Sequence, residues 1–112
     1  MRNEYGEELD RNGYTRSVFP EDRCYYADDH LTACYGCDLV RHEVFHHDQG
    51  GATRELSKRY GAWVTLCPTH HGHVHNFPQF HRELQQEAQR RVMDRYGWSE
   101  DDFRNKFGKN YL

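Results

Sequence analysis

The chain has 112 residues, of which 36% are apolar, and a mean hydropathy of -1.14, so it fits one small domain with a thin hydrophobic core. It has no apolar run long enough to cross a membrane and no apolar signal-peptide core in residues 1–20, so we expect a cytoplasmic protein. The net charge of -3 argues against a generally basic, histone-like nucleic-acid-binding protein, and a domain with so few apolar residues usually needs a metal, disulfides or a partner for stability.

Residues 1–22 have mixed charge and no hydrophobic period, which predicts an irregular or partly ordered N-terminal arm. Acidic side chains are concentrated here, because residues 1–30 hold eight acidic and four basic residues. This acidic arm is a candidate contact surface for a protein partner. Residues 23–112 are expected to form a single domain.

The next elements are predicted as two strands with a short helical turn between them. LVRHEVF at 39–45 and AWVTL at 62–66 are rich in β-branched and aromatic residues, which favours strands. Residues 49–51 are predicted to form a loop, and residues 54–60 a short helical turn.

Three helices are predicted to follow. The first begins at Pro68, since proline is tolerated at the first helical position. The second runs from Pro78 to Tyr96 and ends at Gly97, a C-cap position. Its apolar residues recur every four positions, at Phe80, Leu84, Ala88 and Val92.

The last predicted helix has capping signals at both ends. Ser99 is followed three residues later by Asp102, an acidic variant of the capping box, and Trp98 and Phe103 occupy the positions of a hydrophobic staple. Gly108 is placed to end the helix.

The cysteines indicate a zinc site. Without a secretory signal, thiolate ligation of a metal is favoured over disulfides. Cys34-x-x-Cys37 and Cys67-x-x-His70 each offer two ligands separated by two residues, and together they supply the four ligands of tetrahedral structural zinc. The alternatives are four unpaired structural cysteines, or a site in which Cys24 replaces one member of the first pair.

The histidines indicate a second metal. His71 and His75 lie four residues apart on the helix that begins at Pro68, so they share one helix face and can bind one ion. His46 and His47 form a neighbouring pair upstream. Surface histidines, or one shared zinc cluster, are the alternatives.

The order of these motifs resembles the HNH endonucleases, whose core is a ββα-metal fold. The segment GGATRELSKRYGAWVTLCPTHH (50–71) and the ending FRNKFGKNYL (103–112) resemble small HNH-type proteins encoded by bacteriophages and prophages. The resemblance covers roughly residues 34–112. It implies an α+β fold in which a zinc-stapled ββα-metal domain is followed by two C-terminal helices.

The resemblance also implies roles for individual residues. His46 would ligate a catalytic divalent metal, His47 would act as general base on water, and His71 and His75 would be further metal ligands. A base with an ordinary pKa near 6.5 suits neutral pH, and Mg²⁺, Mn²⁺, Ni²⁺ or Zn²⁺ would offset the charge of a phosphodiester. The implied function is a DNA endonuclease or nickase that serves phage DNA processing or recombination.

The sequence departs from this pattern in one place and is open to a second alignment in another. The Asn that orients the general base in many members has no counterpart near Gly61 and Ala62. In addition, some phage members have His-Glu and two apolar residues within the first strand, so His42 and Glu43 could replace the 46–47 pair. We prefer the 46–47 pair because it needs no insertion or deletion.

A local phosphate-binding surface is predicted from Arg54, Lys58 and Arg59, although a solvated helix face is the plainer explanation of these cations. The missing Asn favours an alternative function, a catalytically silent, zinc-stabilised module. Such a module would bind nucleic acid, or would act as a protein-interaction factor resembling a phage inhibitor.

Overall fold

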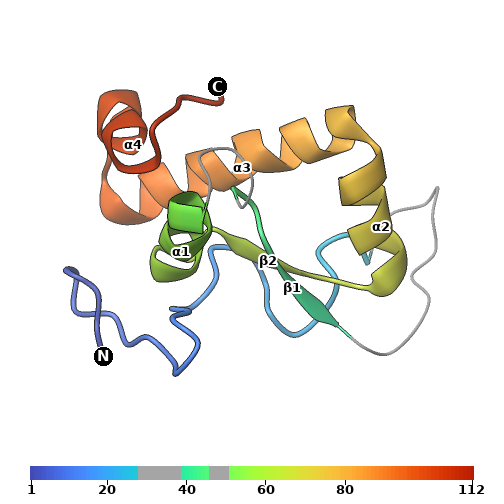
Figure 1. Cartoon of the computed structure of the whole chain (residues 1–112), viewed down its shortest axis with the longest axis horizontal. Coiled ribbons are helices and arrows are strands. Elements are labelled where there is room, and N and C mark those ends of the chain that lie inside the picture. The colour runs from blue at the N-terminus through green and yellow to red at the C-terminus, as the bar shows by residue number, and fades with distance from the viewer. Residues whose placement is uncertain (28–38, 46–50) are drawn as a thin grey trace.

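A two-stranded antiparallel sheet lies at the centre of the chain and helices surround it (Figure 1). The computed structural model describes residues 1–27, 39–45 and 51–112, without the side chains of residues 51 and 52. In this part of the chain the elements are β1 (Val40–Glu43), α1 (Gly51–Arg59), β2 (Trp63–Leu66), α2 (Pro68–Asn76), α3 (Pro78–Tyr96) and α4 (Glu100–Phe107). The predicted α+β class is therefore confirmed.

The sheet pairs β1 with β2 in a register that runs from Val40 opposite Leu66 to Glu43 opposite Trp63. All four residues of β2 are buried, whereas β1 passes from a partly exposed Val40 to a buried Glu43. This burial fits the β-branched and aromatic composition from which the strands were predicted. Both strands are shorter than the segments predicted as strands.

Helix α1 is longer than the predicted turn and begins at Gly51. Its polar residues Thr53 and Ser57 are buried, and the Ser57 hydroxyl accepts a hydrogen bond of 3.3 Å from the backbone N–H of Phe45. Hydroxyl groups satisfied in this way can face a core, so the buried side of α1 is not marked by apolar residues. For this reason the helix predicted from the sequence is shorter than α1.

Helices α2, α3 and α4 confirm the predicted boundaries. Pro68 and Pro78 each stand in the first turn of a helix, and α3 ends at Gly97 in the left-handed conformation with φ +68°. Ser99 accepts a hydrogen bond from Asp102 N, and the Asp102 carboxylate accepts one from Ser99 N. The predicted capping box is therefore present, and α4 ends at Gly108.

The N-terminal segment is irregular, as predicted, but it packs against the sheet. Thr15 O accepts a hydrogen bond of 2.8 Å from Trp63 Nε1, and the Ser17 hydroxyl donates to Trp63 O. Phe19 is buried in the core, with 3% of its surface exposed. The segment is held by polar contacts and by scattered aromatic side chains, which leave no periodic pattern in the sequence, so its packing was not predicted.

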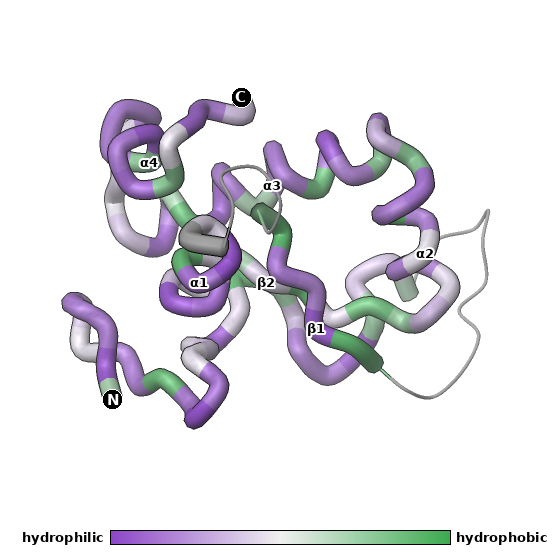
Figure 2. Tube along the Cα trace, viewed as in Figure 1, coloured by the Kyte–Doolittle hydropathy of each residue, from purple (hydrophilic) through white to green (hydrophobic). Residues whose placement is uncertain are grey.

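The core continues from the sheet to the C-terminal helices. Phe45 contacts Phe103 and Phe107 of α4, with ring centroids 5.5 and 5.1 Å apart. Most of the surrounding tube is hydrophilic, including much of α3 and α4 (Figure 2). Within the described residues, every helix is too short or too polar to cross a membrane.

Candidate metal centres

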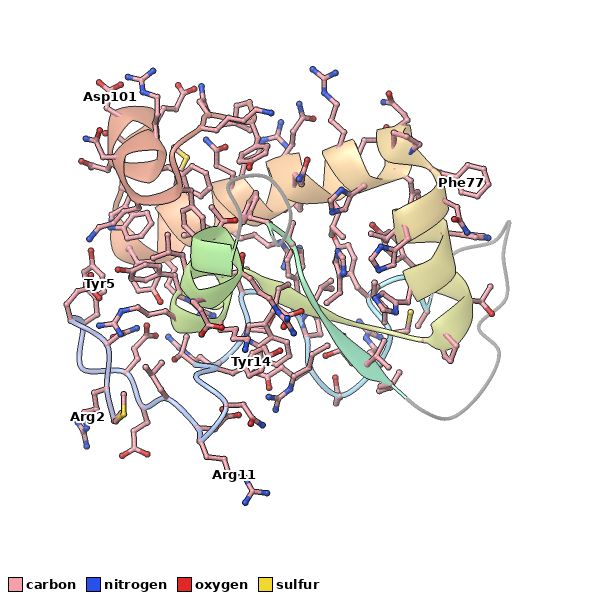
Figure 3. All side chains as sticks on the ribbon, in the orientation of Figure 1. Arg2, Tyr5, Arg11, Tyr14, Phe77 and Asp101 are labelled. Carbon is pink, nitrogen blue, oxygen red and sulfur yellow. The ribbon has the colours of Figure 1, made fainter. Side chains whose placement is uncertain are left out.

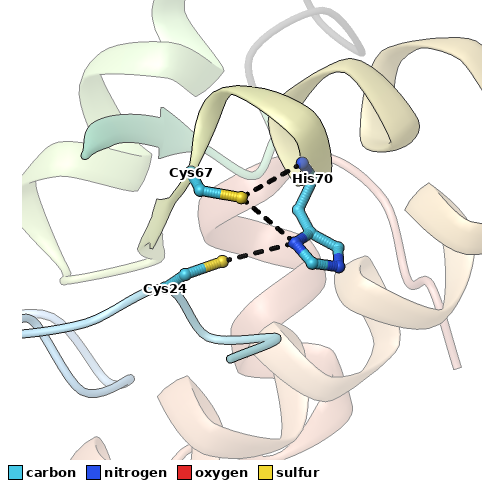
Figure 4. Close-up of side chains that lie close together, drawn as sticks. All are labelled: Cys24, Cys67 and His70. Carbon is cyan, nitrogen blue, oxygen red and sulfur yellow. Dashed lines mark hydrogen bonds between the residues drawn. The ribbon is translucent and has the colours of Figure 1, made fainter. Parts of the chain in front are cut away.

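The first candidate centre lies where the N-terminal segment meets the start of α2 (Figure 4). Cys67 is the N-cap of α2, and its sulfur accepts a hydrogen bond from His70 N at 3.4 Å. The His70 Nδ1 atom lies 3.2 Å from Cys67 Sγ and 3.6 Å from Cys24 Sγ. All three side chains are buried, and their ligand atoms lie within 4.8 Å of one another.

This arrangement fits a zinc ion. With bonds of about 2.3 Å to sulfur and 2.0 to 2.1 Å to nitrogen, a tetrahedral zinc holds S and N ligands about 3.6 Å apart. The separation from Cys24 agrees with that value, and the one from Cys67 is a few tenths of an ångström shorter. Two thiols and an imidazole buried together are also a costly group unless a metal or hydrogen bonds satisfy them.

The predicted zinc ligands are therefore placed in part. Cys67 and His70 lie together as predicted, whereas Cys34 and Cys37 lie outside the described residues. Cys24, which the sequence offers only as a replacement ligand, is the third member of the group. Its separation from Cys67 along the chain gave no short motif by which it could be recognised.

The second candidate centre brings β1 and α2 together. His42 is on β1 and only 2% exposed, while His71 and His75 stand one turn apart on α2. The His71 and His75 Nε2 atoms are 3.0 Å apart, and the His42 ring centroid lies 5.4 and 5.3 Å from theirs. Ligand atoms of the three rings lie within 4.8 Å of one another.

Electrostatics also favour metal binding here. Burial lowers the pKa of His71 below its usual value and a positive charge on His75 lowers it further, although Glu43 acts in the opposite direction. An imidazole must be neutral to ligate a metal. The lowered pKa therefore keeps the His71 lone pair available at neutral pH.

Glu43 does not face this centre. Side chains alternate along a strand, so Glu43 and Arg41 point to the face opposite His42. There the Glu43 carboxylate accepts hydrogen bonds from Tyr14 at 2.5 Å and Arg54 at 3.2 Å. Burial alone would raise the pKa of Glu43, but these hydrogen bonds outweigh it and lower the pKa. The two residues of the alternative alignment are therefore apart: His42 lies at the second candidate centre, and Glu43 lies on the other face of β1.

The predicted catalytic pair, His46 and His47, lies outside the described residues. A residue without a predicted role, His81 of α3, lies beside the second centre instead. Its Nε2 atom is 3.4 Å from His42 Nε2. His81 belongs to a different helix from His71 and His75, so no local spacing connects it to them.

The predicted phosphate-binding residues are divided between two places. Arg54 and Lys58 line an open pocket of about 700 Å³ together with Arg11 and Arg41, beside Tyr14. Figure 3 shows Tyr14 near the strands, whereas Arg11 projects outward. Arg59 is not on this pocket and pairs with Glu4 at 3.2 Å.

Comparison of the chain with protein-family models, with curated proteins and with solved structures finds no match. The two centres and the basic pocket are therefore the features of the chain that bear on its function.

Proposed function

We propose that the chain is a metal-dependent DNA endonuclease or nickase of the ββα-metal type, with one divalent ion held by His42, His71 and His75. The observation that carries this proposal is the convergence of the three imidazoles from β1 and α2 within 4.8 Å. The separate Cys24, Cys67 and His70 group would hold a structural zinc, which suits a domain with a thin apolar core.

The three histidines suit this chemistry. Neutral imidazoles bind Zn²⁺, Ni²⁺ and other borderline divalent ions, and three of them leave at least one position for a substrate oxygen. The ion would supply stabilisation of the charge that develops on a phosphodiester and on its leaving oxygen. His42 is 2% exposed, so its ring is held by packing before any ion arrives.

The general base is proposed to be His47. Glu43 is engaged with Tyr14 and Arg54 on the other face of β1, so it does not compete for that role. His46 and His42 are alternatives for the same metal-ligand position. The 46–47 alignment gives this position to His46, whereas the geometry favours His42. The proposal therefore combines a ligand on β1 with a base that follows the strand.

Cleavage of supercoiled plasmid DNA tests the activity. We expect the purified chain to nick plasmid with Mg²⁺, Mn²⁺ or Ni²⁺, and His71→Ala to reduce cleavage to background because it removes a ligand. His73→Ala is the matched control, since His73 is on the same helix but outside the group. Plasmid that stays supercoiled with every ion between pH 6 and 9 contradicts the proposal.

Three further variants distinguish the alignment that uses His46 and His47 from the one that uses His42. His42→Ala should weaken binding of the catalytic ion, because His42 is a ligand. His47→Ala should abolish cleavage and leave the metal content unchanged, and His46→Ala should spare metal binding. Loss of the ion in His46→Ala, with binding retained in His42→Ala, would restore the alignment that we first preferred.

The basic pocket favours a second candidate, a nucleic-acid-binding module without cleavage. Four cationic side chains line it, of which Arg41 pairs with Asp10, Arg54 with Glu43 and Lys58 with Glu55. The Arg41 guanidinium lies 4.5 Å above the Tyr14 ring. Cations that surround an aromatic side chain suit the phosphates and bases of a nucleic-acid strand. Such a module needs the pocket and does not need the catalytic ion.

DNA affinity measured at several salt concentrations tests this candidate. The Arg11→Ala/Arg54→Ala double variant should weaken binding and reduce the salt slope by about 0.9 for each lost phosphate contact. Arg90→Ala/Arg104→Ala removes the same charge outside the pocket and is the control. If the chain is a binding module, His71→Ala should retain its DNA affinity, and neither the wild type nor any variant should cleave DNA. Equal DNA affinity in the two double variants would show that the pocket is not the DNA-binding site.

A further inference from the structure

The imidazoles of His42 on β1 and His81 on α3 form a contact that the proposed function does not use. His81 lies in the first turn of α3, outside the strand β1 and the helix α2 that carry the His42, His71 and His75 group. Its Nε2 atom is 3.4 Å from His42 Nε2, and the ring centroids are 5.4 Å apart. His81 is only partly buried.

These separations match two ligands of one ion. With metal–nitrogen bonds of about 2.1 Å, neighbouring imidazole nitrogens lie about 3.0 to 3.4 Å apart, for six and four ligands respectively. The ring centroids are then about 5.2 Å apart for four ligands. His42 has centroid distances of 5.4, 5.3 and 5.4 Å to His71, His75 and His81, so it is the common neighbour of all three rings.

A hydrogen bond between the two Nε2 atoms is incompatible with ligation by His42 through this atom. A ligating nitrogen has neither a proton to donate nor a lone pair to accept one. An ion bound to His42 Nε2 would therefore leave His81 Nε2 facing that ion. His81 is not among the side chains whose ligand atoms all lie within 4.8 Å of one another, so its side chain would have to rotate to reach an ion held by His42, His71 and His75.

We propose that His81 is the fourth imidazole ligand of this centre, so that the ion joins β1, α2 and α3. This inference rests on the proposed metal centre and adds a residue from outside the strand and the helix that form it. The number of imidazole ligands also determines which metal ions keep a position for a substrate oxygen. Four imidazoles fill the tetrahedral shell of Zn²⁺, whereas Mn²⁺, Co²⁺ or Ni²⁺ with six ligands keeps two positions for oxygen.

Cobalt binding tests the proposal without DNA. The full chain is first loaded with one equivalent of Zn²⁺ to fill the thiolate centre, and Co²⁺ is then titrated while its visible absorption is followed. His81→Ala and His81→Gln should each weaken Co²⁺ binding at least tenfold and change the shape of the absorption bands. His73→Ala should leave both unchanged.

Thermal unfolding of the variants before Co²⁺ is added shows whether each one is folded. Folded His81→Ala and His81→Gln proteins that bind Co²⁺ within twofold of the wild type, with the same spectrum, overturn the proposal. Plasmid cleavage is scored separately. A wild-type chain that binds Co²⁺ through His81 but cuts no DNA refutes the nuclease and leaves the fourth ligand in place.

The metal dependence of cleavage gives a second, independent readout. In the wild type, Zn²⁺ should suppress the cleavage supported by Mn²⁺, because four imidazoles close its coordination shell. His81→Ala should relieve this suppression, since it opens one position. Equal suppression by Zn²⁺ in both proteins counts against His81 as a ligand.

Discussion

Among single residues, Cys24 is a side chain whose role only the tertiary structure shows. It reaches the start of α2 from the irregular N-terminal segment, and its thiol is 3.6 Å from His70 Nδ1. The Tyr26 ring stacks on the His70 imidazole with centroids 5.3 Å apart, which covers part of this centre. A metal here would tie the segment to the helix.

We therefore expect Cys24→Ser to lower both the zinc content and the melting temperature of the protein. Loss of a structural zinc ligand removes part of a binding free energy that also stabilises the fold. Elemental analysis and thermal unfolding measure the two effects. Cys34→Ser is measured in the same way for comparison. An unchanged zinc content in Cys24→Ser would favour the predicted pair Cys34 and Cys37 as the ligands in place of Cys24.

Gly61 and Gly72 are glycines with opposite requirements. Gly61 has φ +75°, and a Cβ atom there would collide with Arg16 O and come within 2.6 Å of Arg95 Nη1. Gly72 lies within α2, and a Cβ atom there would have no neighbour within 4 Å. One position needs glycine for the entry to β2, and the other does not.

Gly61→Ala should destabilise the protein by about 2 kcal/mol or more, through backbone strain and the collision. Gly72→Ala should instead stabilise it by up to about 1 kcal/mol, because alanine is the better helix former. Denaturant unfolding of the metal-loaded proteins checks both values. A neutral Gly61→Ala would mean that the turn before β2 tolerates a side chain.

At the scale of elements, α4 is defined by its ends and by one aromatic face. Its N-terminus has the capping box of Ser99 and Asp102, and the Phe103 and Phe107 rings stack with centroids 4.6 Å apart. Both phenylalanines are buried, at 0% and 1% exposure. A helix of eight residues is marginal by itself, so it depends on the burial of this face and on its cap.

Ser99→Ala should therefore cost about 1 kcal/mol of unfolding free energy, because it leaves a helix N–H group without its acceptor. Ser99→Gly should cost only a few tenths, since glycine is also favoured at the N-cap. Equilibrium unfolding of the two variants gives the comparison. Equal losses would indicate that the hydroxyl hydrogen bond contributes little.

At the scale of the whole molecule, the N-terminal segment is held to α1 and α4 by charge. Glu4 contacts Arg59 at 3.2 Å and Lys106 at 3.1 Å, and it also accepts a hydrogen bond from Tyr60. Burial alone would raise the pKa of Glu4, but the hydrogen bonds from Tyr60, Lys106 and Arg59 lower it to about 2.

The lowered pKa sets the direction of a pH effect. Glu4 binds a proton more readily in the unfolded chain, so its stabilising contribution is complete above pH 4.5 and is lost as the pH falls towards 2. Glu4→Gln should reduce stability at pH 6 and flatten this acid limb, whereas Glu8→Gln should not. Unfolding curves between pH 2 and 6 test the effect, and parallel curves for Glu4→Gln and the wild type contradict it.

The sequence by itself determined the elements and part of each candidate centre. Hydrophobic period, prolines and capping residues act within a few positions, so they predicted the strands, α2, α3 and α4. The i, i+4 spacing likewise placed His71 and His75 together, because it depends only on helix geometry. Short-range rules of this kind require no knowledge of the fold.

Only the tertiary structure decided which distant side chains meet. Cys24 joins Cys67 and His70, and His42 joins His71, through packing between segments that no local pattern connects. Alternation along β1 puts His42 and Glu43 on opposite faces, and the tertiary structure decides that α2 covers the face of His42. The nine histidines raised several possible ligand sets, and the arrangement of β1, α2 and α3 selects among those that are described.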